Sequence, residues 1–112
     1  MTKYRPGDVV LLEVVFSEGS GSKHRPALII SNDEYHRNRQ EIIIAAITSN
    51  VERVLVGDTK LDFWKEAGLL LPSVVTGIIQ TMKAGMVIRK LGTAASQDLQ
   101  KVQISLKKAI NF

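Results

Sequence analysis

The 112-residue chain contains no cysteine. It can therefore form no disulfide bond, no thiolate nucleophile and no cysteine-based zinc site. It also has no apolar run near the roughly 20 residues that a membrane-spanning helix needs, and no signal peptide is recognisable at its start. These absences exclude thiol enzymes and favour a protein of the reducing cytoplasm with no membrane association.

The residues that are present can form one small core. Apolar side chains make up 45% of the chain, which suits a single domain spanning residues 1–112, and dimerisation would hide further apolar surface. The net charge of +4 weakly indicates a polyanionic partner. Residues 82–112 carry a surplus of five positive charges, against one for residues 1–40 and a deficit of two for residues 41–81.

The hydrophobic pattern predicts a mostly β chain of the α+β class, folded as a small barrel or curled antiparallel sheet. A polar loop is expected over Ser17–His24, a short helical turn after Asn32 or Asp33, and another turn that ends near Gly68. The two strands expected over the isoleucine-rich runs Ala27–Ile30 and Ile42–Ile47 should be covered on both faces. The expected strands are Val9–Phe16, Ala27–Ile30, Ile42–Ile47, Val51–Val56, Val74–Thr81 and Met86–Leu91.

The C-terminal segment has the spacing of an amphipathic helix. Ser96 is the expected N-cap, and Asp98 lies in the first turn, where the helix dipole favours a negative charge. Lys107 and Lys108 lie near the end that favours cations. One apolar face follows from the spacing of Leu99, Val102, Leu106 and Ile110.

Four segments, taken in order, resemble the MazF/PemK/Kid family of toxins. "GDVVLLEVVFSEGSGSKHRPALIISND" is similar to the family's N-terminal signature, and "AAITSN" to its second signature. "LPSVVTGIIQT" and the tail "IRKLG…LQKV" are similar to the third region and the terminal helix. The resemblance covers nearly the whole chain. It implies a small SH3-like antiparallel barrel with short helical turns and a C-terminal helix.

The resemblance also implies an activity and its partners. Characterised toxins of this family are sequence-selective, metal-independent endoribonucleases that cut single-stranded RNA as mRNA interferases. They form homodimers, and each is the toxin of a type II toxin–antitoxin pair, neutralised by a cognate antitoxin from the same operon. The toxin–antitoxin complex is also a candidate to bind operator DNA. The resemblance therefore implies RNA, an antitoxin and a second copy of the chain as partners.

Site residues follow from the resemblance by matching position. Arg25 corresponds to the catalytic arginine, Thr48 to the catalytic hydroxyl, and Ser49 lies beside it. The loop Phe16–His24 would line the RNA groove. The substrate-binding candidates are Phe16, Ser17, Gly19, Ser20, Lys23, Ser49, Gln80 and Lys83.

These residue types suit RNA cleavage because RNA carries its own nucleophile, the 2′-hydroxyl. The protein then has to align the strand, stabilise charge on the phosphoryl oxygens and manage two protons. The guanidinium of Arg25 suits the charge but is a poor base, and Thr48 can hydrogen-bond a phosphoryl oxygen. No cofactor or metal is expected, and His24, His36 and the acidic residues show no metal-binding spacing.

The proton acceptor is the gap in this assignment. Many relatives have an acidic residue in the third region, but Thr76–Thr81 contains no carboxylate, and Gln80 stands where many have an arginine. His24 is the nearby group that titrates near neutral pH, which makes it the candidate base.

Other interpretations remain open at this point. Arg25 could pair with Glu13, Asp33 or a backbone carbonyl, and Thr48 could be a turn hydroxyl. The chain could also be a non-catalytic nucleic-acid-binding or partner-binding module of the same fold, or its strands could mainly bind an antitoxin peptide. Gyrase-poisoning toxins of this fold act through their last residues, typically a Trp near a Gly-Ile end, and the ending "KKAINF" argues against that version.

Overall fold

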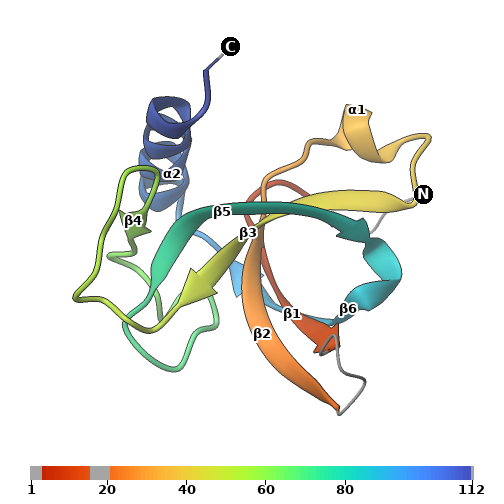
Figure 1. Ribbon diagram of the computed structural model, residues 1–112, viewed down its shortest axis with the longest axis horizontal. Coiled ribbons are helices and arrows are strands. Elements are labelled where there is room, and N and C mark those ends of the chain that lie inside the picture. The colour runs from red at the N-terminus through yellow and green to blue at the C-terminus, as the bar shows by residue number, and fades with distance from the viewer. Residues whose placement is uncertain (1–3, 16–20, 112) are drawn as a thin grey trace.

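The computed structural model describes residues 4–15 and 21–111, which form a six-stranded antiparallel sheet in the order β4-β5-β3-β2-β1-β6 (Figure 1). Among these residues β4 and β6 do not pair, so the curled sheet is an open barrel. The predicted class, mostly β with a C-terminal helix, is confirmed. The elements are β1 Asp8–Val15, β2 Ser22–Ile29, α1 Asp33–His36, β3 Glu41–Thr48, β4 Thr59–Lys60, β5 Val74–Lys83, η1 Ala84–Met86, β6 Val87–Thr93 and α2 Ser96–Ala109.

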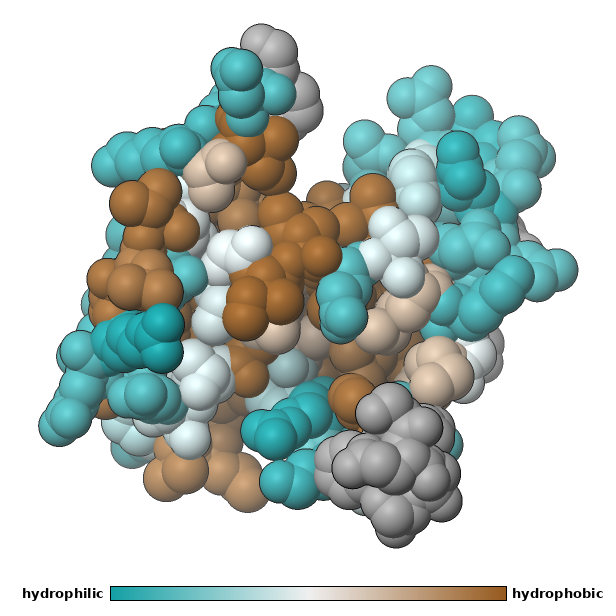
Figure 2. Space-filling model, viewed as in Figure 1, coloured by the Kyte–Doolittle hydropathy of each residue, from teal (hydrophilic) through white to brown (hydrophobic). Residues whose placement is uncertain are grey.

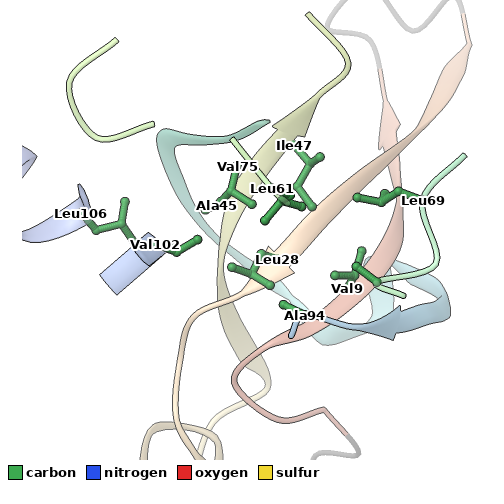
Figure 3. Packing of buried hydrophobic residues seen from close by; sticks show 11 residues of the cluster. Val9, Leu28, Ala45, Ile47, Leu61, Leu69, Val75, Ala94, Val102 and Leu106 are labelled. Atoms are coloured by element: carbon green, nitrogen blue, oxygen red, sulfur yellow. The ribbon is translucent and has the colours of Figure 1, made fainter. Parts of the chain in front are cut away.

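Residues Ala27–Ile29 of β2 and most of β3 are buried on both faces, as their continuous apolar runs predict, whereas Ser22–Arg25 of β2 are exposed. Alternate side chains join two separate clusters. The helix-side core packs Leu28, Ala45 and Ile47 against α2 and the turn before β5 (Figure 3). The second core lies on the other face of the sheet and consists of Val10, Leu12, Ala27, Ile29, Ile42 and Ile44.

The C-terminal helix α2 closes the helix-side core with Val102 and Leu106, and Leu99 packs against it. Its predicted face is therefore correct over these three residues, whereas Ile110 follows the helix end and is 37% exposed. The predicted N-cap is wrong, since Ser96 is the first helical residue and Ala95 caps the helix without a side-chain hydrogen bond. No helix in the described part of the chain is long and apolar enough to cross a membrane.

The predicted strand Val51–Val56 is wrong. This segment is a turn followed by irregular chain, and Val54, Leu55 and Val56 are each more than half exposed. Apolar side chains are visible at the surface around β4 in Figure 2. The carboxylate of Asp58 fixes the segment by accepting the Leu55 N–H at 2.8 Å, which favours a turn over a strand ladder.

Two turn predictions are confirmed and one loop boundary is wrong. The Asn32 side chain caps α1 by accepting the Tyr35 N–H at 2.9 Å. The second turn ends at Gly68, whose φ of +84° is the left-handed conformation that favours glycine. However, β2 begins at Ser22, so His24 belongs to a strand. Pairing with β1 extends the strand beyond its apolar residues.

Candidate functional site

Arg25 and Thr48 lie at the same level on neighbouring strands. The β2–β3 register pairs Ala27 with Ala46, and continuing it by two residues takes Arg25 to the level of Thr48. Because side chains two residues apart share a face, both follow the second-core side of the sheet. The pairing stops before this level, so the two polar residues stand where the strands separate.

A groove of about 590 Å³ opens beside these two residues. Its apolar lining comes from β1, β2, β3, β6 and the turn before β5, and its polar lining comes from strand ends. The lining residues are Leu11, His24, Arg25, Pro26, Ile47, Thr48, Ser49, Gly68, Leu69, Leu70, Leu71, Ser73, Arg89 and Leu91.

The lining of this groove includes two arginines and a histidine but no Asp or Glu. The alternative of a structural ion pair for Arg25 is not found within the described residues. Glu13 accepts a hydrogen bond from Ser22 Oγ at 3.3 Å, and Asp33 pairs with Arg5 at 3.5 Å. The groove is therefore a positively charged site suited to an anion.

Thr48 is a turn hydroxyl, as one interpretation of the sequence has it, because its Oγ1 accepts the Asn50 N–H at 3.1 Å. Because Thr48 Oγ1 is the acceptor in this bond, its own hydroxyl proton remains available for a hydrogen bond to a ligand. Thr48 also lines a second groove of about 360 Å³, together with Arg53, Leu55, Val56, Asp58, Thr76, Gly77 and Ile78.

The stretch without a carboxylate forms an irregularity in β5. The β3–β5 register shifts between Ala45 and Ile47, which leaves extra residues on β5. Thr76 Oγ1 donates to the Ala46 carbonyl at 2.8 Å, and the Gly77 N–H donates to Asp58 Oδ1 at 2.8 Å. Asp58 thus brings a carboxylate to this region, but both of its oxygens accept backbone amides, which makes it a structural group.

His24 lines the same groove as Arg25, but strand alternation directs its side chain to the face of Pro26 and Leu28, opposite to that of Arg25. It pairs with Glu13 in the β1–β2 register, so the side chains of these two residues share a face. Ser49 lines the groove beside Thr48. The arrangement brings a titratable imidazole near the proposed arginine without placing the two side by side.

Three predicted substrate-binding residues lie outside the groove lining, namely Lys23, Gln80 and Lys83. Gln80 is exposed on β5 opposite Ile44. Lys83 bonds the Glu41 carboxylate at 2.9 Å, which lowers the pKa of that carboxyl from its ordinary value. The remaining loop predictions, Phe16, Ser17, Gly19 and Ser20, lie outside the described residues.

Sequence reasoning missed Arg89 in the larger groove and Arg53 in the smaller one. Arg89 reaches the site because β6 pairs with β1, where it stands opposite Leu11. Such a long-range pairing leaves no local signal in the sequence. Within the described residues, no group of three or more His, Cys, Asp or Glu side chains could hold a metal ion.

Comparison with known protein families gives one match, over residues 5–110. The matching family is described as PemK-like, MazF-like toxins of type II toxin–antitoxin systems. No curated protein sequence matches the chain. The family match spans both grooves and every described strand.

Solved structures share this fold at low sequence identity. A mycobacterial endoribonuclease in complex with its cognate antitoxin is 20% identical, with a TM-score of 0.73 over 95% of this chain and 93% of its own. The Mycobacterium tuberculosis toxin MazF-mt6 is 22% identical, with a TM-score of 0.71 over 92% and 99%. A Deinococcus radiodurans MazE–MazF structure is 17% identical, with a TM-score of 0.77 over 95% of this chain and 94% of its own. At identities this low, the structural similarity establishes the fold alone.

Proposed function

Since the chain belongs to the PemK-like, MazF-like toxins of type II toxin–antitoxin systems, we propose that it is an endoribonuclease that cuts single-stranded RNA without a metal. The observation that carries this proposal is that Arg25 and Thr48 lie at the same level on neighbouring strands, beside a groove whose lining contains no acidic residue. A mycobacterial relative of the same fold is an endoribonuclease, which supports the assignment. Recognition of a particular RNA sequence is part of the proposal.

The reaction uses the substrate's own 2′-hydroxyl. Its oxygen attacks the adjacent phosphorus, the bond from phosphorus to the 5′-oxygen breaks, and the products end in a 2′,3′-cyclic phosphate and a 5′-hydroxyl. Arg25 stabilises the charge on the phosphoryl oxygens and delivers a proton to the 5′-oxygen, regaining one from water. Thr48 donates a hydrogen bond to a phosphoryl oxygen.

His24 is the candidate acceptor of the proton that leaves the 2′-hydroxyl. It lines the groove of Arg25, and a neutral imidazole nitrogen can accept a proton. In this assignment, His24→Ala should cleave RNA about 10²-fold more slowly than the wild type. Cleavage by His24→Ala at the wild-type rate would remove His24 from the mechanism.

The direct test incubates purified protein with mixed-sequence RNA in EDTA. We expect cleavage to 2′,3′-cyclic phosphate ends, none with a 2′-deoxy substrate, and a rate about 10²- to 10³-fold lower in Arg25→Ala. Thr48→Ser keeps the hydroxyl and should retain cleavage, whereas Thr48→Val should lose most of it. Lys108→Ala, on the exposed end of α2, is the charge-matched control.

Absence of cleavage, or equal cleavage by Arg25→Ala and the wild type, would refute the proposal. Binding of RNA without cleavage would favour the alternative of a non-catalytic binding module. The lack of a carboxylate over Thr76–Thr81 is the observation that favours this alternative.

We further propose that this single toxin domain acts in the cytoplasm as a homodimer, neutralised by an antitoxin encoded beside it. Solved structures of the same fold include complexes with antitoxins, which supports such a partner. Binding of operator DNA would belong to the toxin–antitoxin complex. Co-purification with the neighbouring gene product, followed by mass measurement in solution, tests the partner and the stoichiometry together.

A further inference from the structure

We infer that Arg89 binds a phosphate of the substrate strand next to the one that Arg25 contacts. The inference rests on the proposed function and adds a positioning residue to that site. Arg89 and Arg25 line the same groove but come from β6 and β2, on opposite sides of β1.

The strand pairings align Arg89 of β6 with one residue on β1 and one on β2. Leu11 on β1 pairs with Pro26 on β2 and with Arg89 on β6, and all three line the groove. Cross-strand partners share a face, so the Arg89 side chain stands on the groove side of the sheet. Arg25 directly precedes Pro26, so strand alternation starts its side chain on the second-core face, and it lines the groove from the edge where β2 and β3 separate. Arg89 thus stands on the side of the apolar floor, and Arg25 borders it.

The charge of Arg89 is not neutralised within the described part of the molecule. The described ion pairs involve Arg5, Lys83, Lys90 and Lys101, and none includes Arg89 or Arg25. Two like charges on one acid-free lining repel each other, and a bound polyanion would remove that cost. The smaller groove differs, because it holds an aspartate beside its arginine.

A phosphodiester strand fits this lining better than an acidic peptide does. Successive phosphates repeat along a strand, and a guanidinium forks onto two phosphate oxygens. The larger groove meets the smaller one at Thr48, which lines both, so an extended strand can continue past the catalytic residues. Arg89 would hold one phosphate in place while Arg25 acts on its neighbour.

The test measures binding of a 2′-O-methyl RNA, which cannot react, at several salt concentrations. Arg89→Ala should weaken binding about tenfold and reduce the slope of log K against log salt by about 0.7, the value for one phosphate contact on a single strand. On a reactive RNA, Arg89→Ala should raise KM more than it lowers kcat, and Arg89→Lys should restore the slope. Lys108→Ala should change none of these, and thermal unfolding checks that each variant is folded.

An Arg89→Ala protein with wild-type affinity and salt slope would overturn the inference. That result would leave the proposed function intact if Arg25→Ala still abolished cleavage. A wild type that binds 2′-O-methyl RNA through Arg89 but never cuts RNA would instead refute the proposed function and keep Arg89 as a phosphate contact.

Discussion

The start of α2 and the larger groove differ in how their charges are compensated. At the start of α2, the Asp98 carboxylate is 1% exposed and accepts the N–H groups of Asp62 and Phe63 at 3.1 and 2.9 Å. Lys101 completes the site at 3.5 Å. In the larger groove, Arg25 and Arg89 share a lining that has no acidic residue. The charges at the start of α2 compensate one another, whereas the charges of the larger groove are not compensated within its lining.

The difference shows where stability and where function should be sought. A buried carboxylate with every contact satisfied fixes the start of α2 against the turn before β5, and its removal leaves amides without partners. Exposed arginines without ion pairs contribute little to stability, and their removal should affect ligands instead. Substitutions at the two sites separate these two roles.

The largest effect is expected from Asp98→Ala. This change removes a buried carboxylate that accepts two backbone N–H groups and should lower the free energy of unfolding by about 3 kcal/mol. Urea denaturation measures it. Asp62→Ala is the control, because that side chain is 65% exposed and pairs with the same Lys101 at the surface. Equal losses in the two variants would contradict the structural role of Asp98.

Gly68→Ala is expected to cost about 2 kcal/mol. Gly68 has a φ of +84°, and a Cβ there would meet the carbonyl oxygen of Leu91 on β6. Since Gly68 lines the larger groove, cleavage should fall as well. Gly85→Ala is the matched control, because a Cβ there meets nothing within 4 Å. A Gly68→Ala protein as stable as the control would show that the turn adapts.

The same two sites explain what the sequence predicted. Arg25 and Thr48 were identified by resemblance, and the strands that carry them follow from apolar runs at Ala27–Ile30 and Ile42–Ile47. Arg89 was missed because it enters the groove only through the β1–β6 pairing. The helix start was mislocated because Asp98 is held by a tertiary contact, so no local cap at Ser96 was required.

The strand predicted over Val51–Val56 is wrong for a related reason. Its apolar composition predicts a strand, yet no strand in the described part of the chain pairs with it, and Asp58 organises it from outside the apolar run. Composition reports what a segment would bury if a partner were available. Which partner is available depends on the whole sheet.

A smaller effect is expected when the groove arginines are removed. Arg25→Ala and Arg89→Ala should change the free energy of unfolding by less than about 0.5 kcal/mol. Because like charges repel more strongly at low salt, each change should be neutral or stabilising there and vanish at high salt. Urea denaturation at two salt concentrations measures this. A clear destabilisation by Arg25→Ala would mean that Arg25 has a structural partner after all.

The smallest effect concerns Glu41 and Lys83, a pair that is matched in charge but lies at the surface, at the end of β3 far from Thr48. The hydrogen bond from Lys83 holds the pKa of the Glu41 carboxyl below its ordinary value of 4.5. A carboxyl with a lowered pKa in the folded state contributes stability above its unfolded pKa, and this contribution is lost as the pH falls through the folded value. In Lys83→Ala the Glu41 titration, followed by NMR, should move up toward 4.5, while RNA cleavage stays at the wild-type rate. Reduced cleavage in Lys83→Ala would instead restore Lys83 as a substrate-binding residue and extend the substrate-binding surface along β5.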